Sequence, residues 1–314
     1  MPRLKVIVNP IAGRGYGSRV SPSIAEHLHA LGADFDLIHT AYAGQAIQLA
    51  QQAVEQGYDI VVAVGGDGTA HEVVNGLMAA YNGAGEQMKP ALACIPAGNG
   101  NDFATMNGAS HDVQADCEMI VRGATHPVDV GRVTLDGAIT RYFSNAVGIG
   151  FDALVTMETY RHRHLRGMAL YIPVVLKTIF QTMQPTRLEI LCDQQEIHRT
   201  TLATIIANGP REGGSFLVAP AARCDDGLLD LMMADDMSRL SMLAMVPRFM
   251  RGTHVKHRLV SIRQARRIVI SSVDPLYTHV DGEVLTPDPV RHVEIQVIPG
   301  CLRMIVPEGD SKRG

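Results

Sequence analysis

The chain is poor in aromatic residues. It has no tryptophan, and aromatic side chains make up only 5% of its 314 residues. The five cysteines are scattered and never form a Cys-x-x-Cys pair, which excludes a disulfide framework and a zinc ribbon. The formal net charge is only −4, so the chain as a whole gives no electrostatic reason to expect nucleic acid as a partner. These features are typical of a protein in the reducing cytoplasm.

Several further signals are absent. No apolar run is long enough to span a bilayer, and the N-terminus enters a strand-like segment without a signal-peptide pattern. We therefore expect any membrane contact to be peripheral, on the inner face. The chain has no Gly-x-x-x-x-Gly-Lys-[Ser/Thr] loop and no Gly-x-Ser-x-Gly motif, which excludes P-loop enzymes and hydrolases with a nucleophile elbow. The length and the 46% hydrophobic content favour two globular domains.

The first part of the chain alternates between two patterns. From Leu4 to about Val130, short apolar runs that end at Pro10, Gly66 and Gly98 are separated by segments with helical spacing. The helical segments are Val20 to Leu31, Ala43 to Gln56 and Thr69 to Tyr81. This alternation predicts a parallel sheet covered by helices on both faces. Ligands of such sheets bind beyond the carboxyl ends of the strands, where these glycine-rich loops lie.

After Asp129 the pattern changes. Runs rich in β-branched residues, separated by turn signals, predict a mainly antiparallel β domain. Two segments are helical in pattern. One runs from Asp152 to Met183, with a break expected near Pro173, and the other runs from Met237 to about Arg251.

Three glycine-rich loops follow predicted strands. They are Val64–Thr69 (VGGDGT), Ile95–Ala104 (IPAGNGNDFA) and Asn9–Gly15 (NPIAGRG). Glycines let backbone N–H groups approach phosphate oxygens, and the following helix N-terminus favours an anion. Asp67 would repel a phosphate unless a magnesium ion or bridging water lies between them. The alternative for each loop is an ordinary turn between a strand and a helix.

Two acidic motifs lie in the second part. In Asp281-Gly282-Glu283 the first two residues fit a β-turn, and Glu283 is a candidate general base for a substrate hydroxyl. The stretch from Gly213 to Asp230 ends in DDGLLD and fits either a tight turn or a magnesium site with oxygen ligands.

Together these motifs resemble the diacylglycerol kinase catalytic domain family, in particular the soluble bacterial lipid kinases. The likeness covers nearly the whole chain and rests on NPIAGRG, GGDGT, PAGNGNDFA, the GG…P…DDGLLD stretch and DGE, in this order. GGDG alone is shared with NAD kinases and, in similar form, with phosphofructokinases. The DDGLLD and DGE motifs favour the lipid kinases.

The resemblance implies a nucleotide-binding α/β domain similar to NAD kinase and phosphofructokinase, and a mainly antiparallel β-sandwich. It places residues 1–130 in the first domain, 131–301 in the lipid-substrate domain, and 302–314 in a segment that returns to the first domain. ATP would lie between the domains. The residues expected to bind it are Asn9, Thr40, Gly65, Gly66, Asp67, Gly68, Thr69, Ala70, His71, Gly98 and Asn99. Family members usually carry threonine at the position of Asn99, and asparagine still donates and accepts hydrogen bonds.

By the same resemblance, Asp67, Asp102 and Asp129 would organise Mg²⁺ and water around the phosphates. Glu283 would accept the proton of the lipid hydroxyl. A second, structural Mg²⁺ would be bound by the carboxylate of Asp226 and the main-chain carbonyls of Arg223 and Leu228.

The function expected is therefore ATP- and Mg²⁺-dependent phosphorylation of a lipid hydroxyl, with diacylglycerol to phosphatidic acid as the first candidate. The alternatives are an NAD kinase-like transferase acting on a soluble nucleotide, and a nucleotide- or lipid-binding regulator without turnover. The expected partner is a membrane lipid at the bilayer surface. A homodimer is left open, and no nucleic acid is expected.

Two basic segments bear on membrane contact. From Met237 to Val273 there are several arginines and no acidic residue, and Arg161 to Arg166 is also rich in arginine and histidine. Such segments attract anionic lipid headgroups. The alternative is that these charges lie on solvated faces and that the neighbouring apolar residues belong to the core.

Overall fold

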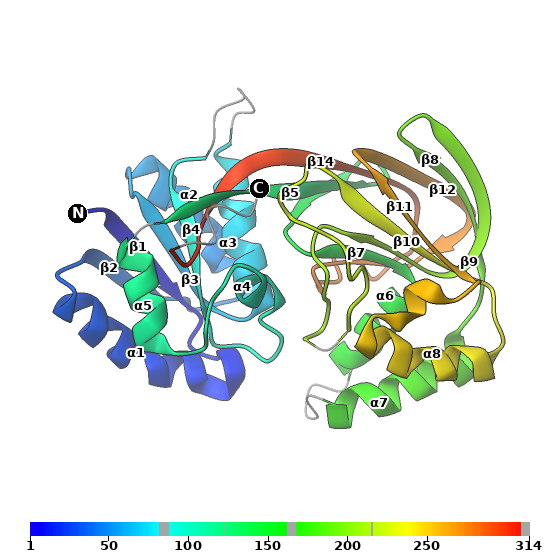
Figure 1. Cartoon of the computed structure of the whole chain (residues 1–314), viewed down its shortest axis with the longest axis horizontal. Helices are drawn as coiled ribbons and strands as arrows, with labels where there is room; N and C mark the ends of the chain where they lie inside the picture. Colours follow the sequence, from blue (N-terminus) through cyan, green and yellow to red (C-terminus); the bar gives the residue numbers. More distant parts are fainter. Residues whose placement is uncertain (82–87, 123, 162–167, 215, 309–314) are drawn as a thin grey trace. The chain divides into compact units, whose positions relative to one another are not determined.

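The structure, a computed structural model, describes residues 1–81, 88–122, 124–161, 168–214 and 216–308. The chain divides into two compact units (Figure 1). The first combines residues 1–130 with 298–314, and the second is formed by residues 131–297. The second boundary therefore lies at residue 297, whereas the sequence placed it at residue 301.

The first unit contains a parallel sheet. Its strands in spatial order are the end of β14 (Val290–Ile305), β4 (Ala91–Pro96), β3 (Ile60–Gly65), β1 (Arg3–Val8) and β2 (Asp34–His39). Each neighbouring pair is parallel. Met304 of β14 pairs with Leu92 of β4, so the end of this strand extends the sheet of the first unit.

Helices cover both faces of this sheet. On one face, α1 (Ala12–Ala30) packs against α5 (Val113–Arg122). On the other face, α2 (Gln45–Glu55) packs against α3 (Asp67–Ala79). The side chains of Leu4, Val6 and Val8 point to the core that contains α1 and α5. The intervening Ile7 is also fully buried, because the opposite face is covered as well. The short helix α4 (Asp102–Met106) follows β4.

The second unit is mainly antiparallel. Its strands are β5 (Thr125–Leu135, which begins in the first unit), β6 (Ile139–Phe143), β7 (Ala146–Gly150), β8 (Thr186–Cys192), β9 (Gln195–Ala207), β10 (Leu229–Asp235), β11 (Val260–Ala265), β12 (Arg267–Leu276) and β13 (Thr278–Val280), with the first part of β14. One path runs β11-β10-β9-β8-β12-β14, while β7 pairs with β9 and β13, and β5 pairs with β6. These pairs within the second unit are antiparallel.

Two hydrophobic cores lie on opposite faces of this sheet. Along β10, Leu231 and Met233 point into a core made by strands, whereas Met232 and Ala234 point into a core shared with helices. This alternation follows from the two-residue period of a strand. The helical elements are α6 (Phe151–Arg161), α7 (Met168–Lys177), the π-helix η1 (Thr178–Thr182), α8 (Arg239–Arg251) and the 3₁₀ helix η2 (Thr253–Lys256).

The break expected near Pro173 is wrong. Helix α7 continues through Pro173, which lies on the exposed side of the helix. There water can satisfy the carbonyl group that a proline leaves without a partner. The π-helix η1 follows directly, so the irregular turn lies after Lys177.

Among the described helices, none is both long and apolar enough to cross a membrane. The basic run from Arg161 to Arg166 falls almost wholly on residues 162–167, outside the described part of the chain.

Candidate functional site

The three glycine-rich loops of the first unit pack directly on one another. A Cβ atom on Gly98 would lie 2.3 Å from the Cα atom of Gly66. One on Gly13, which has a φ of +54°, would lie 2.3 Å from the main-chain oxygen of Ala97. Both distances are far below van der Waals contact. Glycine is therefore required here by the close approach of one loop to the next, in addition to any role toward a ligand.

Asp67 joins two of these loops. One carboxylate oxygen accepts the backbone N–H of Asn101 at 2.7 Å, and the other accepts that of Phe103 at 3.2 Å. Asn101 is the N-cap residue of α4 and Phe103 lies in its first turn, where an acidic side chain is favourable. Asp67 also lies in the first turn of α3. The residue predicted to organise magnesium thus fixes the geometry of the loops.

Asn101 completes this connection. Its side-chain oxygen accepts the N–H of Gly98 at 2.8 Å, and its amide group donates to the carbonyl of Gly98 at 3.1 Å. Its φ of +58° is uncommon for a residue other than glycine, although asparagine tolerates it better than most. Asn101 was not among the site residues predicted from the sequence.

The remaining loop is held by Asn9. Its side-chain amide donates to the hydroxyl of Thr69 at 3.0 Å, and its backbone N–H donates to Val64 at 2.9 Å. The Thr69 hydroxyl leaves no room at Gly65, where a Cβ atom would lie 2.2 Å from it. The structure therefore brings four predicted regions, around Asn9, Gly65, Asp67 and Gly98, to one edge of the sheet.

Other predicted residues of the first unit have local partners. Thr40, at the end of β2, donates its N–H to the carbonyl of Val8. Ala70 and His71 are buried on α3, where the imidazole lies 3.3 Å from the side-chain amide of Asn75. Asn99 is exposed on the loop, and Gly68 is half-buried at the start of α3.

The two remaining predicted aspartates are buried. Asp102 lies in the first turn of α4. Asp129 accepts the N–H of Gly300 at 2.7 Å and so holds the returning C-terminal strand. Within the described residues, the side chains of Asp67, Asp102 and Asp129 do not form a cluster with ligand atoms close enough to bind one metal ion directly.

In the second unit, Asp281-Gly282-Glu283 forms a tight turn after β13. Asp281 and Gly282 have φ angles of 49° and 78°, and Val280 and Glu283 exchange backbone hydrogen bonds. This is the geometry for which hairpins favour Asp-Gly. The carboxylate of Asp281 accepts the backbone N–H groups of Ser144, Asn145 and Ala146 at 2.9–3.0 Å.

The candidate base Glu283 is held by an aromatic residue. The hydroxyl of Tyr160, near the end of α6, donates to its carboxylate at 2.7 Å and lies 3.2 Å from the carbonyl of Gly282. No spacing or motif in the sequence pointed to Tyr160, because 123 residues separate it from Glu283.

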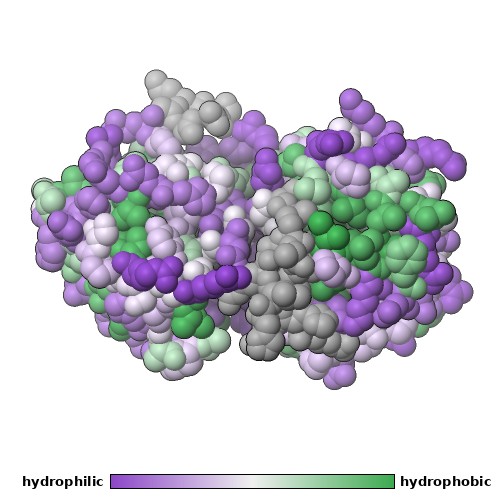
Figure 2. Space-filling model, turned by 90° about the horizontal axis from the view of Figure 1, so that it is seen from below, coloured by the Kyte–Doolittle hydropathy of each residue, from purple (hydrophilic) through white to green (hydrophobic). Residues whose placement is uncertain are grey.

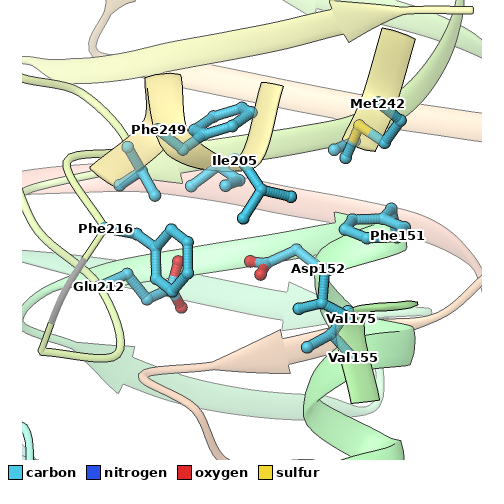
Figure 3. Close-up of a pocket in the computed structure, with 12 residues that line it drawn as sticks. Phe151, Asp152, Val155, Val175, Ile205, Glu212, Phe216, Met242 and Phe249 are labelled. Carbon is cyan, nitrogen blue, oxygen red and sulfur yellow. The ribbon is translucent and has the colours of Figure 1, made fainter. Parts of the chain in front are cut away.

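An apolar pocket lies between β9 and the helices of the second unit (Figure 3). Its volume is about 50 Å³. Its walls come from α6, α7, β9, α8 and the segment after β9 and are lined by Phe151, Asp152, Val155, Val175, Ala203, Ile205, Glu212, Phe216, Val218, Met242, Val246 and Phe249. Figure 3 shows the two carboxylates, Asp152 and Glu212, approaching each other at one wall. The lining, which is apolar apart from these two carboxylates, fits an apolar group with a few polar atoms.

The two carboxylates share one partner, His279 of β13. Its Nε2 atom lies 2.7 Å from Asp152 and 3.2 Å from Glu212, and the side chain is fully buried. Burial alone would lower the pKa of His279, but the carboxylates of Glu212 and Asp152 outweigh it and raise this pKa to about 9. Burial and the facing Asp152 raise the pKa of Glu212 well above its usual range. The cluster of His279 and Glu212 therefore keeps one extra proton at neutral pH.

Among the described residues, Asp152, Glu212 and His279 form the one group of three His, Cys, Asp or Glu side chains that could hold a metal ion. Their ligand atoms all lie within 4.8 Å of one another. However, the Nδ1 atom of His279 accepts the N–H of Gly282 at 3.2 Å. The ring proton is then on Nε2, the atom that faces the carboxylates, so Nε2 has no lone pair for a metal ion. The arrangement fits a hydrogen-bonded cluster better than a metal site.

The predicted structural magnesium site lies in an exposed turn before β10. Asp226 accepts the N–H of Leu228 at 3.0 Å, and the guanidinium of Arg223 contacts the carboxylate of Asp225 at 2.9 Å. The Asp226 contact is the local turn that the sequence left open as an alternative. The magnesium site at Arg223, Asp226 and Leu228 stays a prediction.

Comparison with known proteins adds independent information. Residues 3–133 match the diacylglycerol kinase catalytic domain, and residues 145–306 match the YegS C-terminal NAD kinase beta sandwich-like domain. These matches confirm the predicted fold class and the predicted resemblance.

Individual relatives cover nearly the full length. A diacylglycerol kinase of Mycobacterium tuberculosis is 30% identical over 97% of this chain and 95% of its own. One from Bacillus subtilis is 27% identical over 90% of both chains. A crystal structure of a putative diacylglycerol kinase from Bacillus anthracis superposes with a TM-score of 0.78 and 25% identity, covering 98% of both chains.

Proposed function

The chain belongs to the diacylglycerol kinase family, and we propose that it is a lipid kinase that transfers the γ-phosphate of ATP, with Mg²⁺, to a hydroxyl of a membrane lipid. Diacylglycerol is the first candidate substrate, with phosphatidic acid as product. The observation that carries this proposal is the apolar pocket of the second unit, because a soluble nucleotide has no apolar chain to fill it. An NAD kinase-like activity is therefore the weaker alternative.

The loops of the first unit fit the phosphates of a nucleotide. At Gly66 and Gly98 a side chain would fill the space where the loops approach one another, and α3 begins at this edge of the sheet. Backbone N–H groups at a helix N-terminus favour anions. Asp67 lies among them, and bound Mg²⁺ would neutralise charge on the transferred phosphoryl group there. Asn9 and Asn101 keep the loops in place, so phosphate binding requires little rearrangement.

In the second unit, Glu283 is the group that accepts the proton from the lipid hydroxyl. Tyr160 and the turn at Asp281 and Gly282 orient its carboxylate. Positioning and charge stabilisation carry most of phosphoryl transfer, so a single oriented base is sufficient. The pocket would hold an apolar segment of the lipid and so limit the positions that its hydroxyl can take.

The membrane is the proposed source of this lipid. The outer side of α8 exposes Leu240, Leu243 and Met250 beside Arg248 and Arg251, and Ile172 and Phe180 are exposed on α7 and η1. Figure 2 shows hydrophobic surface on the second unit, on the side where Figure 1 places α7 and α8. The inner side of α8 contributes Met242, Val246 and Phe249 to the pocket. Exposed apolar residues next to arginines favour binding to an anionic bilayer.

The activity is tested by transfer of labelled γ-phosphate from ATP to a panel of lipids in mixed micelles, with NAD as the soluble acceptor. We expect a labelled lipid that requires Mg²⁺, and loss of transfer of about 100-fold or more in Glu283→Ala and Asp67→Ala. Labelled NAD would instead support the soluble-nucleotide alternative. Binding of ATP or lipid without any transfer would support a regulator.

Membrane contact is tested separately by co-sedimentation with vesicles that contain anionic phospholipid. Leu240→Glu should weaken binding about tenfold, because it removes apolar contact and adds repulsion. Val273→Glu is the matched control, since the two side chains are similarly exposed at 73% and 75%. Equal binding of both variants, or binding that ignores anionic lipid, would refute the proposed surface.

A further inference from the structure

The pocket and the turn that carries Glu283 are connected by one side chain. The imidazole of His279 contacts Asp152 and Glu212, which line the pocket, through Nε2, and Gly282 through Nδ1. We propose that His279 is a positioning residue, which holds the Asp-Gly-Glu turn through Gly282 and so orients Glu283 for proton transfer. This inference rests on the proposed kinase function.

The polarity of the contacts fixes the state of the ring. The Gly282 N–H donates to Nδ1 at 3.2 Å, so this nitrogen carries a lone pair. The proton is then on Nε2, directed at the carboxylate of Asp152 at 2.7 Å. If the extra proton of the cluster is on the carboxyl group of Glu212, Nδ1 of His279 keeps the lone pair that accepts the Gly282 N–H. If that proton were on Nδ1, two N–H groups would face each other. The contact with the turn thus requires the proton to reside on Glu212.

The imidazole ring of His279 packs against the backbone of Gly148, where a side chain would not fit. A Cβ atom at Gly148 of β7 would lie 2.1 Å from Nε2 of His279 and 2.4 Å from the carboxylate of Asp152. Gly148 pairs with His279 across β7 and β13, so the ring has a fixed position between the strand and α6. A side chain in a fully buried, fixed position can restrain the residue it bonds.

The other described hydrogen bonds of the Asp-Gly-Glu turn hold Asp281 and Glu283 but not the N–H of Gly282. Asp281 is anchored by its carboxylate to the segment Ser144–Ala146, and Glu283 is contacted by Tyr160. Among the described contacts, the backbone N–H of Gly282, the residue before Glu283, donates to one side chain, that of His279. Loss of this hydrogen bond should let the peptide between these anchors rotate and move the carboxylate of Glu283.

Two substitutions of His279 test the contacts of its two ring nitrogens separately. His279→Gln places an amide near the position of Nε2, so it keeps a donor for Asp152 and Glu212 but loses the acceptor for Gly282. His279→Asn places an amide oxygen near the position of Nδ1, so it keeps the acceptor for Gly282 and loses the carboxylate contacts. Both are neutral amides of similar size, and each serves as the control for the other.

For lipid phosphorylation we expect kcat to fall about tenfold in His279→Gln, with KM for ATP and lipid within about twofold of wild type. In His279→Asn, kcat should stay within about threefold. In a Glu283→Ala background, His279→Gln should cause no further loss, because it acts through Glu283. An equal fall of kcat in both variants, no fall in either, or a further loss in the Glu283→Ala background would overturn the proposal.

A readout without activity keeps the inference separate from the proposed function and from the folding of the variants. In the wild-type protein at pH 7, imidazole ¹⁵N shifts should show that His279 is protonated on Nε2 alone, and the Gly282 amide should be protected from hydrogen exchange. A ring protonated on both nitrogens, or an unprotected Gly282, overturns the positioning role. If wild type shows these signals but phosphorylates no lipid, the kinase proposal fails and the bond between His279 and the turn stands.

Discussion

The two units build their candidate sites from different materials. In the first unit the site consists of glycine-rich backbone, and the side chains of Asn9, Asp67 and Asn101 serve to hold one loop against the next. In the second unit, the site consists of side chains, with apolar walls and a buried cluster of Asp152, Glu212 and His279. The difference corresponds to the proposed ligands, because phosphates bind N–H groups and lipid chains fill apolar volume.

The largest effect should come from separating the two roles of Asp67 in the first unit. Asp67→Asn puts an amide opposite the N–H groups of Asn101 and Phe103 and removes the carboxylate proposed to organise Mg²⁺, so phosphoryl transfer should fall about 100- to 1000-fold. The control is Glu72→Gln, also on α3, since Glu72 accepts the N–H groups of Gly44 and Ala46.

Glu72→Gln should lower the free energy of unfolding by about 1–2 kcal/mol and leave kcat within about threefold of wild type. Steady-state kinetics and denaturant unfolding of both variants make the comparison. Loss of activity in the control as large as in Asp67→Asn would mean that Asp67 acts only by supporting the loops.

A smaller effect is expected from the glycine contacts. Gly98→Ala forces the loops apart, because the new Cβ atom would meet Gly66 at 2.3 Å. A displacement on the order of 1 Å should lower kcat/KM for ATP about 100-fold. Gly57→Ala is the control, since Gly57 has a positive φ of +72° but open space around it. That variant should lose about 1 kcal/mol of stability and little activity, and a similar loss of activity in both variants would contradict the argument.

In the second unit, filling the pocket should affect the lipid and not the nucleotide. Ala203→Leu adds apolar volume at the pocket wall and should raise KM for long-chain lipid about tenfold, with KM for ATP unchanged. Ala138→Leu, in the exposed turn between β5 and β6, is the control. Kinetics with lipids of increasing chain length provide the measurement. A KM that rises equally for short and long chains would place the acyl chains elsewhere.

The smallest effect concerns pH. The folded second unit binds one proton more tightly in the cluster of His279 and Glu212 than the unfolded chain does, because burial and Asp152 raise the pKa of Glu212 and the facing carboxylates Glu212, Asp152 and Asp281 raise that of His279 to about 9. The stability that this proton contributes is present below pH 6.5 and is lost as the pH rises through 9. We expect a loss of about 1 kcal/mol or more over this range in wild type and a smaller one in Glu212→Gln.

Hydrogen exchange at pH 6.5 and pH 9.5, corrected for the intrinsic exchange rate, measures this loss in each unit separately. We expect decreased protection in β7, β9 and β13 and little change in β1 and β3. A decrease of the same size in the first unit would show that the cluster is not its cause.

The secondary structure was predictable where periodicity was strong. The apolar runs that end at Gly66 and Gly98 are β3 and β4, and the segment from Met237 to Arg251 is α8 almost to the residue. The elements β2, α4 and α5 of the first unit were not predicted. In β2 the burial alternates with no fully buried residue, and α5 lies in a stretch of mixed polarity. The break predicted near Pro173 is wrong because this proline lies on the exposed side of α7 and the helix continues through it.

The candidate site divides in the same way. The residues of the glycine-rich loops and the Asp-Gly-Glu turn could be named from the sequence, because their conformation is local and needs particular residue types. Asn101 lies inside the loop Ile95–Ala104 and was still missed, because its role depends on hydrogen bonds to Gly98 and to the distant Asp67. Tyr160, Asp152 and Glu212 had no local signal at all.

The sequence by itself determined the alternation of strands and helices, the loops fit for phosphate and the acidic turn, because each depends on neighbours a few residues apart. The tertiary structure decided which distant groups meet. Asp152 and His279 are 127 residues apart and form a buried hydrogen bond, and the pocket gathers its walls from five segments. Burial and the facing carboxylates then shift the pKa values of His279 and Glu212, an effect that depends on the folded surroundings and is absent from the linear chain.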